Sequence, residues 1–167
     1  MEILIEDRQD RYRIAHEEIK KKAKTILDAL ECHDGELSIL IVDDPEIARL
    51  NKTYLGRSGP TNVIAFPMQE GPFGQINPNI LGDVVISLDT AAREAQDAGI
   101  SVESRLDQLL IHGILHLFGF DHEKTPEEAK RMAKKAEELL EFLRESRSVP
   151  KLDESANLSS PWPRPGS

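Results

Sequence analysis

Hydrophobic positions along the chain follow two different periods, which predict strands and helices in alternation. Apolar–polar alternation and short β-rich runs predict strands over residues 2–6, 36–42, 62–66 and 80–88. Apolar residues at helical spacing predict helices over residues 11–31, 89–99, 102–118 and 125–145, with a short one that starts at 44. Strands and helices are thus interspersed, and residues 67–79 read as a loop. We therefore expect an α+β fold, a mixed sheet of about four strands with helices packed on one face.

The predicted helices carry capping signals. We expect Asp44 to be the N-cap of the short helix, with Pro45 at its first helical position. Asp89 is expected to cap a helix that Gly99 ends in the left-handed conformation. Thr125 opens a capping box before the last helix.

The segment that starts at about Arg147 differs from the rest of the chain. It is rich in Ser and Pro and has little hydrophobic periodicity, so it cannot bury enough apolar surface to offset the entropy of ordering. We predict one domain over residues 1–146 and a disordered tail over 147–167. Trp162 lies in this tail, either as a docking residue or as part of a disordered appendage.

Composition narrows the class of protein. Of 167 residues, 39% are hydrophobic, enough for one core, and a single cysteine excludes an internal disulfide framework. The N-terminus is acidic where a signal peptide would be basic, and no apolar run approaches the length of a membrane span. We expect a cytoplasmic protein without membrane contact.

The charge balance does not favour nucleic-acid binding. Twenty-one Lys and Arg against thirty Asp and Glu give a net charge of −9, whereas a nonspecific nucleic-acid binder carries excess positive charge. RNA contact would need a local basic patch, for which the chain offers KKKAK at 20–24 and KRMAKK at 130–135. Both segments can equally be solvated helix faces.

The most informative stretch is HGILHLFGFDH at residues 112–122. His112 and His116 are four residues apart on a predicted apolar helix, so one ion can bridge their imidazoles. Gly119 can end that helix with a left-handed turn, which would bring His122 back as a third ligand. Three neutral imidazoles with an open fourth position are typical of a catalytic zinc site.

The same histidine spacing occurs in metzincin proteases, which need a glutamate directly after the first histidine as general base. Here that residue is Gly113, which cannot transfer a proton. Peptide hydrolysis by that route is therefore disfavoured, although zinc alone lowers the pKa of water to about 7. The other two histidines, His16 and His33, have no comparable setting, and we expect both at the surface.

Three motifs together resemble the YbeY family of bacterial endoribonucleases, also called rRNA maturation factors. HGILHLFGFDH resembles the family's H-G-x-L-H-L-x-G-x-D-H signature. NKTY at 51–54 with GPTNVIAFP at 59–67 resembles its N-x-x-Y…P-T-[ND]-V-L-S-F-P block, and LGDVVIS at 81–87 resembles its L-G-D-I-x-I-S strand. The resemblance spans about residues 36–142 in the family's order and spacing.

The resemblance implies a single-domain fold, one zinc per chain on His112, His116 and His122, and cleavage of single-stranded RNA. The implied role is small-subunit rRNA maturation and ribosome quality control. The expected partners are rRNA and the ribosome or ribosomal proteins, with no DNA substrate. Water on the metal would attack the phosphate, or zinc would polarise a phosphate oxygen.

The chain departs from the family at one position. The family usually has an arginine directly after the tyrosine of the N-x-x-Y block, and that arginine is thought to act in the active site. Here the position is Leu55, and the nearest guanidinium is that of Arg57. Glycines on both sides could let Arg57 reach a scissile phosphate, to which its bidentate fork is suited. Otherwise Arg57 is an ordinary loop cation.

Two further polar residues carry open alternatives, and a third has one expected role. Asp121 either orients an imidazole or bonds nearby backbone. Asp83, among apolar strand neighbours, is a buried structural acceptor or a wall of the site. Asn62 is expected to bond the turn backbone.

Three functions remain possible on the sequence. The first is a metal-dependent endoribonuclease that uses Arg57 and the metal-bound water. The alternatives are a zinc metalloprotease-like hydrolase, and a non-catalytic ribosome-assembly factor in which zinc serves structure.

Overall fold

The computed structural model describes residues 2–68, 80–121 and 123–147 of the chain. The elements, in chain order, are β1 (Glu2–Asp7), α1 (His16–Ala29), β2 (Glu36–Val42), α2 (Asp44–Leu55), β3 (Val63–Pro67), β4 (Ile80–Ser87), α3 (Leu88–Ala98), α4 (Val102–Leu117) and α5 (Pro126–Arg147). The predicted tail lies outside the described residues from position 148 on. Within the described ranges, no helix combines the length and apolar character that a membrane span requires.

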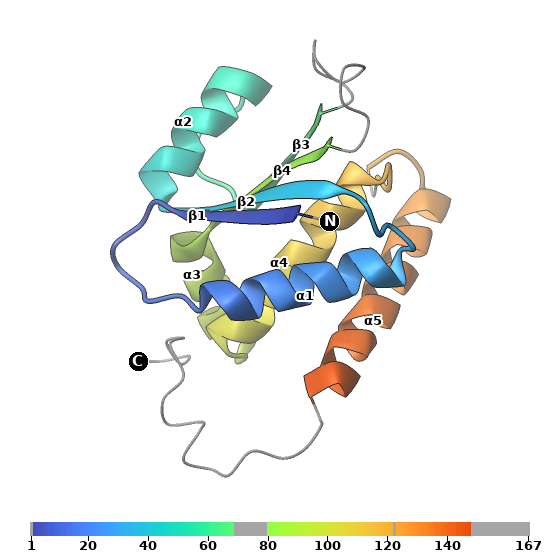
Figure 1. Ribbon diagram of the computed structural model, residues 1–167. Helices are drawn as coiled ribbons and strands as arrows, with labels where there is room; N and C mark the ends of the chain where they lie inside the picture. The colour runs from blue at the N-terminus through green and yellow to red at the C-terminus, as the bar shows by residue number, and fades with distance from the viewer. Residues whose placement is uncertain (1, 69–79, 122, 148–167) are drawn as a thin grey trace, which may run out of the picture.

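The described strands form one mixed sheet in the order β1-β2-β4-β3. β1, β2 and β4 run parallel, and β3 pairs antiparallel with β4 at one edge. Figure 1 shows this sheet between α2 on one side and α1 and α4 on the other. The predicted α+β fold with a four-stranded mixed sheet is confirmed.

The expectation that all helices cover one face of the sheet is wrong. Ile39, Ile41 and Val84 face the main core, which they build with α1, α3, α4 and α5. Val42 and Val85 face the other way and pack with Ile47 of α2 in a second, smaller cluster. The central strands are therefore buried on both faces, and full burial of each such side chain contributes about 1.5–3 kcal/mol. The near-continuous apolar runs ILIV and VVI are typical of such strands.

The first helix begins later than its hydrophobic pattern predicts, at His16 instead of residue 11. The Gln9 carboxamide holds the intervening segment in a turn: its oxygen accepts hydrogen bonds from the backbone N–H groups of Arg11 and Tyr12, at 3.1 and 2.8 Å. Its nitrogen donates to the Tyr12 carbonyl at 2.7 Å. A side chain thus takes backbone partners that a helix would otherwise need.

Two helix caps lie one or two residues before the predicted ones. Asp43, not Asp44, caps α2, and its carboxylate accepts the backbone N–H of Glu46 at 3.0 Å. Ser87, not Asp89, caps α3, and its hydroxyl accepts the next turn's backbone N–H at 3.3 Å. In both segments the sequence offers two capping residues close together, and only the register of the preceding strand decides between them.

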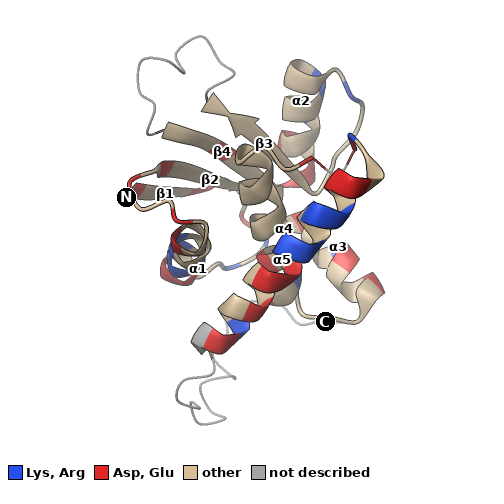
Figure 2. Cartoon of the chain, turned by 90° about the vertical axis from the view of Figure 1, so that its right-hand side faces the viewer, with Lys and Arg blue, Asp and Glu red and all other residues tan. Residues whose placement is uncertain are grey.

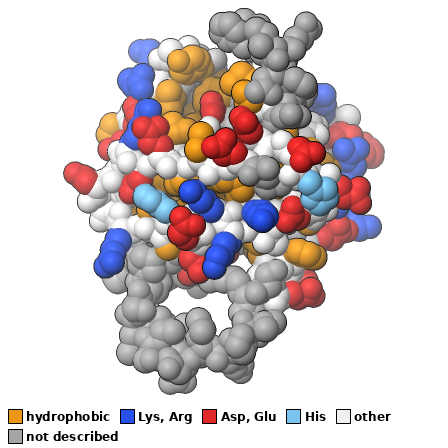
Figure 3. Space-filling view, in the orientation of Figure 1, with side chains coloured by type: hydrophobic (Ala, Val, Ile, Leu, Met, Phe, Trp, Pro, Cys, Tyr) orange, Lys and Arg blue, Asp and Glu red, His pale blue; other side chains and the backbone are white. Residues whose placement is uncertain are grey.

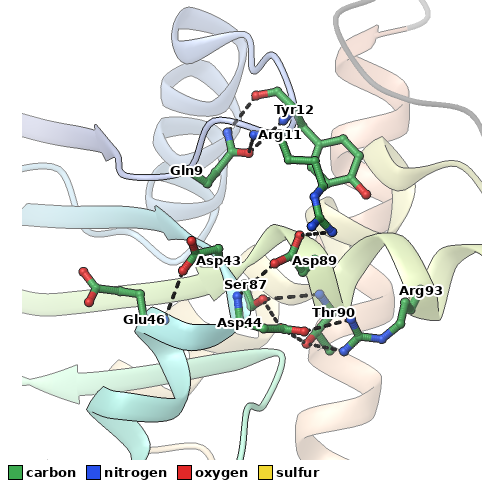
Figure 4. A network of polar contacts seen from close by, with 10 residues as sticks. All are labelled: Gln9, Arg11, Tyr12, Asp43, Asp44, Glu46, Ser87, Asp89, Thr90 and Arg93. Carbon is green, nitrogen blue, oxygen red and sulfur yellow. Dashed lines mark hydrogen bonds and ion pairs between the residues drawn. The ribbon is translucent and has the colours of Figure 1, made fainter.

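The two displaced aspartates link the ends of β2 and β4 instead (Figure 4). The Asp44 carboxylate accepts hydrogen bonds from the hydroxyls of Ser87 and Thr90, each at 2.6 Å, and from Arg93 at 2.8 Å. Asp89 accepts the backbone N–H of Asp44 at 3.0 Å. Burial alone would raise the pKa of Asp44, but these hydrogen bonds outweigh it and lower that pKa. The network is therefore internally satisfied and structural.

Candidate active site

The C-terminal half of α4 presents two histidines on an otherwise apolar helix. His112 and His116 are half-buried, whereas Ile111, Ile114 and Leu115 are fully buried against the sheet. The four-residue spacing places both imidazoles on one side of the helix, as predicted, and both line the same pocket.

The helix ends as the sequence predicts. Gly119 has φ +90°, and its N–H donates to the carbonyl of His116 at 3.0 Å. The N–H of Phe120 donates to the carbonyl of Leu115 at 3.1 Å, which completes a Schellman motif. The third predicted metal ligand, His122, lies outside the described residues. Among those described, no group of three His, Cys, Asp or Glu side chains could hold a metal ion.

The two histidines line a pocket of about 690 Å³ at the β3 edge of the sheet. Its walls come from α4, from β3 and from the loop between α2 and β3, with Asp121 beyond the end of α4. This volume lies within the usual range for small-ligand sites, about 300–1,000 Å³. The pocket therefore has room for part of an organic substrate beside the imidazoles.

Arg57 and Leu55 line this same pocket. Segments about 55 residues apart in the sequence thus place a guanidinium on the pocket that holds His112 and His116. The position at which the resemblance leads one to expect arginine, Leu55, also faces this pocket and is 44% exposed. Both positions therefore have access to a ligand in the pocket.

The Arg57 loop is braced by Asn51, a residue to which the sequence analysis assigned no role. Asn51 is 5% exposed. Its backbone carbonyl accepts the N–H of Arg57 at 3.2 Å, and its side-chain nitrogen donates to the carbonyl of Gly59 at 3.0 Å. Gly56, with φ +66°, ends α2 between them. One buried residue thus holds the loop at Arg57 itself and at Gly59.

Gly113 shows why α4 carries no glutamate after its first histidine. A Cβ atom at this position would lie 2.6 Å from a methyl group of Val84 and 3.2 Å from one of Val63. Because α4 packs this closely on β3 and β4, any side chain there would force the helix or a strand to shift. The packing therefore disfavours a glutamate at the position of the metzincin general base.

Asn62 anchors the start of β3, the strand that forms one wall of the pocket. Its side-chain oxygen accepts the N–H of Val63 at 2.7 Å, which confirms the predicted bond to the turn backbone. Its nitrogen donates to Glu94 of α3 at 3.2 Å, and Arg105 of α4 donates to the same carboxylate at 3.0 Å. The contacts of Asn62 with Glu94, and of Glu94 with Arg105, could not be predicted from the sequence, because no local pattern links these distant segments.

The structure also places the other four candidate residues from the sequence. Asp121 lines the pocket, and its carboxylate accepts the backbone N–H of Glu123 at 2.9 Å, the backbone alternative. Asp83 does not line the pocket: it lies on the sheet face that α2 covers, where burial raises its pKa and a hydrogen bond from Ser38 partly offsets the rise. His16 and His33 are exposed, as expected.

Comparison with known proteins identifies the class of protein to which the chain belongs. A family model described as "Endoribonuclease YbeY" matches residues 4–144, which makes the chain an RNA-cleaving hydrolase. The chain belongs to the YbeY family. It is 52% identical over 144 residues to "Endoribonuclease YbeY" of Geobacter sulfurreducens, covering 86% of this chain and 96% of that one. The corresponding protein of Syntrophotalea carbinolica is 53% identical, with the same coverage.

A solved structure supports the fold assignment. The solution structure of TM1509 from Thermotoga maritima has a TM-score of 0.62 and 28% sequence identity, and the match covers 91% of this chain and 97% of that one. The family and the fold named by the sequence resemblance are thus confirmed, and RNA is the substrate class.

Proposed function

We propose that the chain is a metal-dependent endoribonuclease that cuts single-stranded RNA and acts in small-subunit rRNA maturation and ribosome quality control. The observation that carries this proposal is the shared pocket of His112, His116 and Arg57. Arginine binds phosphate, and paired imidazoles bind a divalent metal. A pocket that offers both suits the phosphodiester of an RNA strand.

The residues present fit one zinc ion per chain. His112 and His116 offer imidazole donors four residues apart on a rigid helix, and His122 is the third ligand in this proposal. When bound, zinc would supply Lewis-acid chemistry, by activating water or polarising a phosphate oxygen.

The chain's own residues bind and orient the RNA. The Arg57 guanidinium binds two oxygens of one phosphate through its planar fork and stabilises the charge that develops there. Asn51 limits the freedom of the loop, which lowers the entropy lost when Arg57 engages the phosphate. An open pocket at a sheet edge suits single-stranded RNA, whose unstacked bases can turn toward the protein.

The partners follow from the same proposal. We infer that the RNA is ribosomal and that the ribosome or ribosomal proteins present it to the pocket, in the cytoplasm. The non-catalytic alternative, an assembly factor with structural zinc, makes a different prediction for the histidines. A folded His116→Ala protein that still supports ribosome assembly would favour that alternative.

A substrate comparison tests the proposed function. We expect zinc-loaded protein to cut a single-stranded rRNA fragment, to leave the same sequence intact in a duplex, and to leave casein intact. Chelation should abolish cleavage, and added zinc should restore it. Cleavage that persists after metal removal, or protease activity without RNA cleavage, would contradict the proposal.

A further inference from the structure

α5 places three cations side by side on its solvent face. Its core-facing side is formed by Met132, Leu139 and Leu143, which are 2–3% exposed. Lys130 and Lys134 lie on the opposite side, Arg131 lies beside them, and all three are exposed. Because residues four apart are neighbours on a helix, these three side chains form one patch, which we call the α5 basic tract.

The tract occupies only the N-terminal part of α5. Beyond Lys135, the next two outward residues are Glu137 and Glu138. Glu127 and Glu128 precede the tract in the first turn of α5, and Figure 2 shows the helix as red at its start, then blue, then red again. A further exposed cation, Arg144, lies near the other end of α5, so the tract is the group of cations on α5 that follows the pocket segment in the chain.

Arg131 connects the tract to the pocket. Its guanidinium carbon lies 4.6 Å from the centre of the Phe120 ring, a distance typical of a cation–π contact. Phe120 directly precedes Asp121, which lines the pocket together with Arg57. The tract therefore begins at the rim of the pocket.

The cations of the tract are available to a ligand. In the part of the chain that the structure describes, Lys130 and Lys134 have no carboxylate partner within salt-bridge distance. Arg131 lies 3.9 Å from Glu128 across exposed surface, and such pairs contribute little. A phosphate could therefore bind these groups without first breaking a strong ion pair.

The other basic segment, residues 20–24 of α1, also has exposed lysines but differs in its place in the fold. Its Lys22 is buried and pairs with Glu103 and Asp107 at 3.0 and 2.8 Å. α1 packs against β1, at the sheet edge opposite the pocket. Figure 3, in which α1 lies toward the viewer, shows positive and negative side chains interspersed on this face. Only the α5 segment combines unpaired cations with a link to the pocket.

We propose that the α5 basic tract binds the phosphate backbone of the single-stranded RNA whose scissile phosphate lies in the pocket. This inference rests on the proposed function. With a net charge of −9, the protein repels RNA at long range, so binding needs local cations beside the site. The tract supplies them along the path that the strand takes over Phe120.

Salt dependence of RNA recognition tests the proposal. In the double variant Lys130→Gln/Lys134→Gln, KM for a 12-nucleotide single-stranded RNA should rise about tenfold at low salt, with kcat and zinc content unchanged. The slope of log(1/KM) against log[salt] should become shallower by about 1.4, since each phosphate contact in a single strand contributes about 0.7. A dinucleotide substrate, too short to leave the pocket, should show no change.

Lys21→Gln/Lys24→Gln on α1 is the matched control. It removes the same charge from two exposed lysines and should leave KM and its salt slope at the parental values. An equal rise of KM in both double variants would mean that only net charge matters, and this would overturn the proposal. A parental salt slope in the α5 variant would overturn it as well. A parent protein that binds RNA without cleaving it would contradict the proposed function but not the tract. In that case, fluorescence anisotropy with labelled RNA gives the same comparison of the two double variants.

Discussion

The two halves of α4 place polar groups in opposite situations. In the N-terminal half, Asp107 is 4% exposed and pairs at 2.8 Å with Lys22 of α1, itself 5% exposed. In the C-terminal half, His112 and His116 are half-buried and border an open pocket. One helix thus carries a closed polar cluster and an open one.

The difference separates stability from function. Lys22 and Asp107 are almost fully buried, and the two partners must match each other because an unpaired buried charge is costly. The histidines border space that the protein itself does not fill. We therefore expect changes in the first cluster to alter the free energy of unfolding, and changes around the second to alter RNA cleavage.

The largest effect on stability is expected from Lys22→Met. This change leaves Asp107 buried without its cation, which should lower the free energy of unfolding by about 3–5 kcal/mol in urea titrations. RNA cleavage at a temperature where the variant is folded should stay at the parental rate. The double variant Lys22→Met/Asp107→Leu should recover most of the stability, and a single variant as stable as the parent would contradict the closed-cluster interpretation.

Arg57→Ala should have the opposite effects, slower RNA cleavage with unchanged stability. Loss of the guanidinium removes stabilisation of the developing phosphate charge and should slow RNA cleavage about a hundredfold, or about 3 kcal/mol. Zinc content and melting temperature should not change. Because Leu55 borders the same pocket, Leu55→Arg in the Arg57→Ala background should restore part of the rate. Parental cleavage by Arg57→Ala would make this arginine a bystander.

Asn51→Ala should give a smaller loss through the same route. Without the bond to Gly59, the loop loses one of its braces, and we expect cleavage to slow about tenfold, or about 1.4 kcal/mol. In the Arg57→Ala background the same change should have little further effect, because the two residues act together. Lys52→Ala, an exposed neighbour, is the matched control. Fully additive losses would exclude a role through Arg57.

The smallest effect on stability and cleavage is expected from deletion of residues 150–167. We predict that this segment belongs neither to the Lys22–Asp107 cluster nor to the histidine pocket. That segment has no apolar periodicity and hence no packing face. The melting temperature, followed by circular dichroism, should change by less than about 4 °C, which corresponds to about 1 kcal/mol for a domain of this size. A larger fall would show that the tail docks on the domain.

Local chemistry made much of the fold and part of the site predictable. The histidine spacing and Gly119 are local signals, and the structure confirms the helix, its end and the shared face of His112 and His116. Asn51 could not be predicted as a brace, because its partners depend on how the chain returns after α2. The placement of α2 on the second face also depends on tertiary packing; the apolar runs of β2 and β4 were a signal of two-sided burial that the one-face expectation did not use.

The most direct test of the central claim is the metal content of purified protein, measured on the same samples as RNA cleavage. We predict about one zinc per chain in the parent, and loss of most of the zinc and of cleavage in each of His112→Ala, His116→Ala and His122→Ala. The Lys22→Met protein should keep its zinc. Full zinc retention in any two of the three histidine variants would contradict the site.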